Sequence, residues 1–144
     1  EGKNIKKKCF GIPCPAAAPE LQMCNRETNN SSAGTATDDG TNGADWYLKN
    51  YGKLPDYYIT KKMAERLGYK SYLGNLSRVA PNKMLFKGIY QNKNRHLPAV
   101  PNRIWYEADI NYEFGYRGTE RILFSNDGLI FVTYDHYATF IEIE

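Results

Sequence analysis

The chain has 144 residues, of which 42% are hydrophobic and 14% aromatic, and its formal net charge is +3. This length and composition predict one compact domain rather than a disordered chain. No apolar run approaches the roughly 18 residues of a membrane helix, so we expect no membrane partner, and the small positive charge allows a polyanionic ligand without requiring one.

The cysteines gather at the start of the chain, where Cys9, Cys14 and Cys24 precede a long cysteine-free remainder. Three is an odd number, so a single disulfide would leave one thiol free, and the disulfide state stays open. No histidine lies nearby and the spacings match no common zinc pattern, so we interpret these residues as part of a leader. Because residue 1 is Glu1 rather than Met, we expect a processed product or a piece of a longer protein.

A polar segment follows the cysteines. Residues 25–43 read NRETNNSSAGTATDDGTNG and contain almost no large apolar side chain. Such a composition buries too little surface to offset the entropy of ordering, and it predicts a flexible linker. We therefore expect a leader and linker over residues 1–43 and a folded domain over residues 44–144.

The first half of this domain shows helical patterns. Large apolar residues recur at helical spacing from Trp46 to Tyr51, and Gly52 follows as a stop signal. Thr60 is a candidate N-cap of a second helix, with Gly68 as its C-cap. A third short turn is predicted from Asn75 to Ala80.

The second half changes to short runs of β-branched and aromatic residues, which are typical of strands. These runs are MLFKGIY (84–90), RIWYEADI (103–110), ERILFS (120–125), LIFVTY (129–134) and TFIEI (139–143). Asn126-Asp127-Gly128 is a strong hairpin signal between two of them. Helices followed by an antiparallel meander predict an α+β domain whose helices pack on one face of the sheet.

Two of the predicted strands carry residues suited to proton transfer. Strand alternation places Glu107 and Asp109 on one face, where Arg117 and Arg121 can reach them from the neighbouring strand. This group is either an ion-pair cluster that stabilises the sheet or part of a catalytic site. His136 lies in the polar loop TYDHYATF, where a histidine is usually a surface residue, although its ordinary pKa suits proton transfer.

Cleavage of RNA by transesterification needs groups of these kinds. A base removes the proton of the ribose 2′-OH, an acid protonates the departing 5′-oxygen, and cations stabilise the charge that grows on the phosphorus. A carboxylate, an imidazole and two or three arginine or lysine side chains supply these parts without a metal or other cofactor.

From about residue 44 to residue 144 the chain resembles the barnase and binase family of small bacterial ribonucleases. The matching segments follow one another in family order and at family spacing. They are KLPDYYITK (53–61), GNLSRVAP (74–81), EADINY (107–112), RILFS (121–125) and DHYATF (135–140). The family fold is α+β, with short N-terminal helices against a five-stranded antiparallel sheet, and we expect it here.

The resemblance also implies roles for individual residues. Glu107 falls at the family's general base and His136 at its general acid, and Tyr137 matches a tyrosine that lines the site. The family's phosphate-binding cations match Lys61, Arg117 and Arg121. Asp109 is interpreted as orienting the two arginines, and His96 matches no site residue.

The resemblance weakens where the family reads guanine. The equivalent loop here is Tyr90, Gln91, Asn92, Lys93 and Asn94, so Asn94 replaces the family's glutamate. An amide accepts hydrogen bonds without the charge that makes a carboxylate a strong paired acceptor. We therefore expect a weaker guanine preference than is usual in the family, or none.

Leader, linker and C-terminal nuclease together suggest the variable tip of a larger bacterial toxin, delivered into rival cells; an ordinary secreted nuclease is the alternative. Either way we expect a monomer, with RNA as substrate. The family's inhibitor, a small acidic protein of the barstar type, implies a similar inhibitor or a cognate immunity protein here, attracted by Lys61, Arg117 and Arg121. A non-cleaving RNA- or protein-binding module is the main competing function, and a metal-dependent nuclease has less support because no tight Asp/Glu/His cluster is visible.

Overall fold

The computed structural model describes residues 6–9 and 27–144. Its helices are α1 (Ala44–Tyr51), α2 (Lys61–Arg66) and α3 (Leu76–Val79), with 3-10 turns at Gly40–Asn42 and Ser71–Leu73. Its strands are β1 (Lys6–Cys9), β2 (Glu27–Ser31), β3 (Tyr58–Thr60), β4 (Met84–Tyr90), β5 (Trp105–Asp109), β6 (Arg121–Ser125), β7 (Ile130–Thr133) and β8 (Ile141–Ile143). Within the described ranges, no helix has the length and apolar character needed to span a membrane. The leader residues Cys14 and Cys24 lie outside the described residues.

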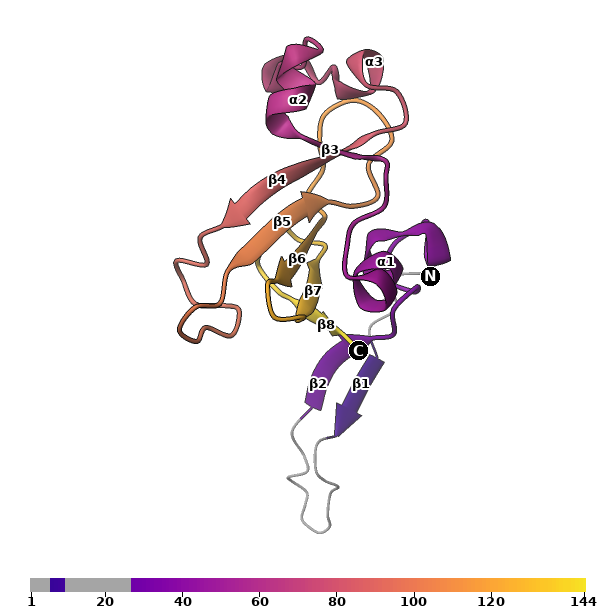
Figure 1. The fold of residues 1–144 in the computed structure, drawn as a ribbon. Coiled ribbons are helices and arrows are strands. Elements are labelled where there is room, and N and C mark those ends of the chain that lie inside the picture. The colour runs from indigo at the N-terminus through magenta and orange to yellow at the C-terminus, as the bar shows by residue number, and fades with distance from the viewer. Residues whose placement is uncertain (1–5, 10–26) are drawn as a thin grey trace.

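The strands form one sheet in the order β1-β2-β8-β7-β6-β5-β4-β3 (Figure 1). The predicted antiparallel meander of five strands, β4 to β8, is confirmed at its centre. The sheet is larger and mixed, however, because β3 joins β4 in parallel and β2 joins β8 in parallel. The expectation of a purely antiparallel, five-stranded sheet was therefore too narrow, since short strands far apart in sequence extend it on both sides.

Local signals explain the predicted helices. Gly52 ends α1 with a left-handed backbone, φ 72°, and its amide donates to the carbonyl of Leu48. The Thr60 hydroxyl caps α2 by accepting from the amide of Met63 at 3.1 Å. Gly68 lies one residue beyond the C-cap of α2, which is Leu67. The third predicted turn is α3.

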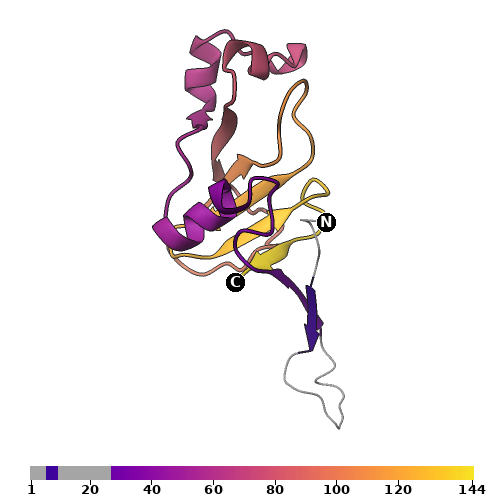
Figure 2. The ribbon, with the colours of Figure 1, turned by 90° about the vertical axis from the view of Figure 1, so that its right-hand side faces the viewer.

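Two apolar layers flank the sheet. On one face, α1 packs against β6 and β7, and the core there includes the fully buried Ala108 of β5, Ile122 of β6 and Val132 of β7 (Figure 2). The opposite face carries a smaller cluster around Trp105 and Leu123. Helices α2 and α3 enclose a third cluster near the start of β4, away from α1 (Figure 1). The apolar cluster around Trp105 and Leu123 is the smaller of the two that cover the sheet faces.

The polar segment expected to be a linker is part of the fold over its described residues. The carboxylate of Asp45, which is fully buried in α1, accepts hydrogen bonds from the amides of Gly34 at 2.7 Å and Ala36 at 3.0 Å. Ala36 is itself fully buried, and β2 pairs with the C-terminal strand. The prediction of a flexible linker up to residue 43 is therefore wrong from residue 27 onward, because hydrogen bonds of its backbone, together with the burial of Ala36, hold this segment.

Candidate active site

Strand β5 presents Glu107 on the face opposite α1. Glu107 pairs with Leu123 of β6 and with Gly88 of β4, where a bulge gives the glycine a φ of 93°. Its neighbour on that face, Trp105, is buried against Leu123. The predicted alternation along this strand is therefore confirmed, and it leaves the Glu107 carboxylate half-buried at the centre of the sheet.

Tyr137 connects Glu107 to the loop predicted to read the base. Its hydroxyl donates a hydrogen bond to Oε1 of Glu107, and its ring stacks on Tyr90 with a centroid distance of 5.4 Å. Burial and the hydrogen bond to Glu107 hold the pKa of the Tyr137 hydroxyl above its ordinary value. Tyr137 therefore remains a hydrogen-bond donor to the carboxylate at neutral pH.

A carboxylate-centred turn holds His136 at the edge of the site. Asp135 Oδ1 accepts from the hydroxyl of Thr133 and the amide of Thr139, each at 2.9 Å, and its Oδ2 accepts from the Thr139 hydroxyl. Both His136 and Tyr137 have positive φ values, 57° and 73°, which non-glycine residues adopt only when their surroundings impose them. The turn thereby directs two consecutive side chains at the site, with their rings 5.0 Å apart.

Asp109 joins the two arginines, as the strand pattern predicted. It accepts from Arg117 through two hydrogen bonds, of 2.5 Å and 2.9 Å, and its Oδ1 lies 3.3 Å from Nε of Arg121. Burial alone would lower the pKa of Arg117, but the hydrogen bonds and charge of Asp109 raise it. The Nε of Arg121 is buried and makes no hydrogen bond within the described structure. One aspartate thus fixes two guanidinium groups that carry more positive charge than it neutralises.

A pocket of about 430 Å³ opens between these arginines and His136. Its lining residues are Tyr69, Ser71, Tyr116, Arg117, Gly118, Thr119, Arg121 and His136. The backbone amide of His136 donates to the carbonyl of Thr119 at 3.0 Å, which ties the histidine turn to the loop that carries Arg117. The pocket therefore combines an imidazole with two guanidinium groups, a combination suited to a phosphate group.

Comparison with known proteins identifies the family of this chain. Residues 28–144 match the family model described as ribonuclease. The chain belongs to the ribonuclease family.

Relatives of this ribonuclease include proteins named Ribonuclease from Heyndrickxia coagulans, Bacillus intermedius and Bacillus pumilus. Each is 47% identical over 97 residues, or 67% of this chain; the match covers 89% of the first protein and 60% of the other two. Among solved structures, the chain is similar to ribonuclease Sa2 with guanosine-2'-cyclophosphate, at 24% identity and a TM-score of 0.36 over 60% of this chain and 94% of that one. It is also similar to ribonuclease Sa2 in complexes with mononucleotides, at 22% identity and a TM-score of 0.37 over 60% and 92%.

The loop of this ribonuclease that was predicted to read the base is held by its own side chain. Asn92 donates to the carbonyl of Leu97 at 2.9 Å and accepts from its amide at 3.1 Å. This clamp shapes the loop through the Asn92 side chain, and the role of Asn92 in binding substrate stays a prediction. Gln91, Lys93 and Asn94 are exposed on the same loop.

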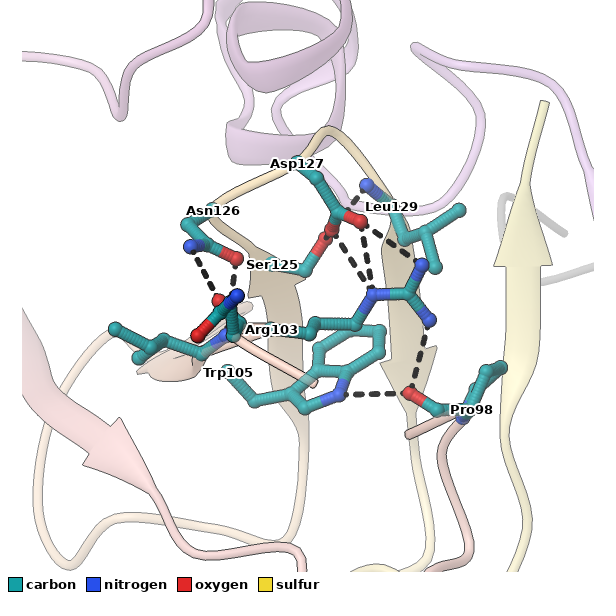
Figure 3. Close-up of polar contacts among 9 residues, drawn as sticks. Pro98, Arg103, Trp105, Ser125, Asn126, Asp127 and Leu129 are labelled. Carbon is teal, nitrogen blue, oxygen red and sulfur yellow. Dashed lines mark hydrogen bonds and ion pairs between the residues drawn. The ribbon is translucent and has the colours of Figure 1, made fainter. Parts of the chain in front are cut away.

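A second network anchors the end of this loop to the sheet (Figure 3). Arg103 donates to both carboxylate oxygens of Asp127 from Nε, at 3.1 and 2.9 Å, and to the carbonyl of Pro98 from Nη1. The Trp105 indole also donates to the Pro98 carbonyl, at 3.1 Å. The turn predicted at Asn126-Asp127-Gly128 thus does more than reverse the chain, because it fixes the strand that carries Glu107.

Lys61 and His96 lie outside this arrangement. Lys61 begins α2 with an exposed side chain whose ammonium group lies 3.8 Å from Glu65, and it does not line the pocket of the two arginines. His96 is exposed and packs edge-on against Phe140. The structure therefore brings Glu107, His136 and the arginines into one region without a contact from Lys61.

Several contributors were not predicted. Asp135 and Thr139 form the turn below His136, and their spacing in DHYAT is the signal that could have identified it. Tyr69, Ser71 and Tyr116 line the pocket of the two arginines from segments distant in sequence. No short-range pattern identifies such residues, because only the tertiary fold brings them to the pocket.

Proposed function

We propose that this ribonuclease cleaves single-stranded RNA with Glu107 as general base and His136 as general acid, while Arg117 and Arg121 bind the scissile phosphate. The observation that carries the proposal is the continuous contact from Glu107 through Tyr137 to His136, next to a pocket lined by both arginines. An in-line displacement at phosphorus requires a base, an acid and cations close to one another, and these contacts supply all three.

In the first step, the Glu107 carboxylate takes the proton of the ribose 2′-OH, and the 2′-oxygen attacks the phosphorus. The bond from phosphorus to the 5′-oxygen breaks, and His136 in its protonated form gives its proton to that oxygen. The hydroxyl of Tyr137 occupies one carboxylate oxygen of Glu107, which leaves the other for the ribose. Arg117 and Arg121, oriented by Asp109, stabilise the charge on the nonbridging oxygens.

The second step hydrolyses the 2′,3′-cyclic phosphate with the roles reversed, as microscopic reversibility requires. His136 takes a proton from water, the water oxygen attacks phosphorus, and Glu107 returns a proton to the departing 2′-oxygen. Glu107 and His136 return to their starting protonation states, so the two steps together consume only RNA and one water molecule.

Digestion of total RNA in the presence of EDTA tests this proposal. Glu107→Ala and His136→Ala are each expected to lower kcat by about 10²- to 10⁴-fold, the usual contribution of a general acid or base. Glu142→Ala and His96→Ala are matched controls, because both residues are exposed and lie outside the pocket, and they should retain full activity. Activity that needs a divalent ion, or that survives in both site variants, would contradict the mechanism.

We also propose weak or absent guanine preference, with Asn94 as its cause, and Lys61 as a peripheral cation that acts on RNA at longer range. Both residues are exposed. The exposed amide of Asn94 offers the base edge an uncharged acceptor. Lys61→Ala should lower kcat/KM less than Arg117→Ala does, since Arg117 lines the pocket proposed to bind the phosphate and Lys61 does not.

A secreted ribonuclease, or one delivered as the tip of a bacterial toxin, requires protection of the producing cell, and we propose an acidic inhibitor or immunity protein that covers this pocket. Arg117 supports this proposal because it presents positive charge at the pocket. The association rate of such an inhibitor should fall steeply with ionic strength and should fall further in Arg117→Ala. An association rate that is unchanged by salt would contradict a steering role for these cations.

A further inference from the structure

An exposed aromatic ring borders the phosphate pocket. Tyr116 lines the same pocket as His136, Arg117 and Arg121, yet 68% of it is exposed. Tyrosine is intermediate in its tendency to be buried, so exposure alone is not unusual, but the proposed chemistry at Glu107 and His136 assigns this ring no role. Its position beside groups that bind a phosphate requires an explanation.

The ring of Tyr116 is fixed in place although it is exposed. Its hydroxyl donates to the carbonyl of Tyr72 at 3.0 Å, which joins the β5–β6 loop to the turn before α3. The ring also lies against Gly74, where an added Cβ atom would come within 3.0 Å of it. A rigid exposed ring loses little conformational entropy when a ligand stacks on it, which is the property of a preformed binding surface.

The position of Tyr116 relates to the direction of the RNA chain. The loop that follows β4 and the loop that carries Tyr116 extend from opposite ends of β5 (Figure 1). Tyr90 and Tyr137 stack on the side of the first loop, and His136 lies between that stack and the pocket lined by Tyr116. With His136 as the proposed proton donor to the 5′-oxygen, the departing nucleotide is expected on the Tyr116 side of His136 and the retained nucleotide on the side of the loop that follows β4.

We propose that Tyr116, supported by Tyr72, is a stacking platform for the base of the nucleotide on the 3′ side of the scissile phosphate. This inference rests on the proposed function, because His136 as general acid sets the direction. Every base has a flat face, so the platform favours no particular sequence, and its contribution is to hold the leaving nucleotide in line.

The test compares substrates with and without a leaving base. For Tyr116→Ala, kcat/KM for the dinucleotide GpA should fall by roughly 5- to 100-fold, the range found for aromatic stacking on a base. Cleavage of the analogue whose leaving nucleotide is abasic should be unchanged, as should hydrolysis of guanosine 2′,3′-cyclic phosphate, which has no leaving nucleotide. Tyr116→Phe keeps the ring and should retain most of the activity on GpA.

Phe114→Ala is the matched control, since Phe114 belongs to the same loop and is 76% exposed but lines a different pocket. It should leave all three reactions unchanged. Equal losses of Tyr116→Ala on GpA, the abasic analogue and the cyclic phosphate would show that Tyr116 only maintains the pocket. No loss on GpA would show that the ring does not touch RNA. Either result overturns the proposed stacking platform. Full GpA cleavage by His136→Ala would instead refute the proposed function, which separates the two failures.

Discussion

Asp109 is the residue whose replacement should disturb the site most through stability. Its side chain is 2% exposed, accepts two hydrogen bonds from Arg117 and lies beside Arg121. The side chains of Arg117 and Arg121 are 17% and 7% exposed. Asp109→Asn keeps the size and one acceptor oxygen but leaves two largely buried guanidinium groups without a counter-charge. Removing one partner of a buried ion pair costs about 3–5 kcal/mol, and we expect a loss of stability in that range.

Urea unfolding at pH 7 measures this loss as a lower midpoint at an unchanged slope. Asp127→Asn is the matched control, because Asp127 also accepts two hydrogen bonds from one arginine but its side chain is 45% exposed. Solvent screens that pair, so its replacement should cost much less. A loss below about 1 kcal/mol for Asp109→Asn, or an equal loss in both variants, would refute the reasoning that burial makes the Asp109 pair matter.

Three further predictions concern single side chains of the site. Asn94→Glu adds a charged acceptor to the loop proposed to read the base, and it should raise the preference for GpA over ApA by about 10- to 100-fold. Cleavage rates of the two dinucleotides measure this preference, and an unchanged ratio would mean that this position does not read the base. Tyr137→Phe removes the hydroxyl that donates to Glu107. It should lower kcat/KM by about tenfold or more with little change in the free energy of unfolding. Equal activity of the variant and the parent protein would show that the hydrogen bond does not position the carboxylate. Hydrogen bonds, above all from the Thr139 hydroxyl, lower the pKa of Asp135 to about 2, so its ionised form stabilises the fold at neutral pH. That contribution is lost as the pH falls from about 4 to about 2, and the difference in unfolding free energy between the parent protein and Asp135→Asn should shrink over this interval; a constant difference would contradict the assignment.

Much of the central sheet follows from local sequence. The run 84–90 is strand β4 to the residue, because its side chains combine β-branched and aromatic groups with a defined turn on each side. Alternation along β5 also correctly placed Asp109 beside Arg117 and Arg121. These features depend on residues that are close in sequence, either within one strand or on consecutive strands and the loop between them, so the local sequence pattern predicts them.

The features that the sequence did not reveal depend on long-range or backbone contacts. The Asp45 carboxylate accepts hydrogen bonds from the amides of Gly34 and Ala36, so a segment with few apolar side chains still folds. The Asn92 side chain carries an amide group that could bind a ligand, but this amide hydrogen-bonds to the backbone of Leu97 in its own loop. The hydrogen bond from Tyr137 to Glu107 spans 30 positions and arises only when β5 and the histidine turn are assembled.

Tyr137 has a consequence for how this ribonuclease distinguishes bases. The same ring stacks on Tyr90 of the loop proposed to read the base and donates a hydrogen bond to Glu107, the proposed general base. If a base binds at Tyr90, as proposed, a poorly fitting base that shifts Tyr90 would alter the position of Glu107 through the ring of Tyr137. Discrimination between bases is therefore expected to be expressed in the turnover number as well as in the Michaelis constant, so that an ill-fitting RNA can occupy the enzyme and still be cleaved slowly.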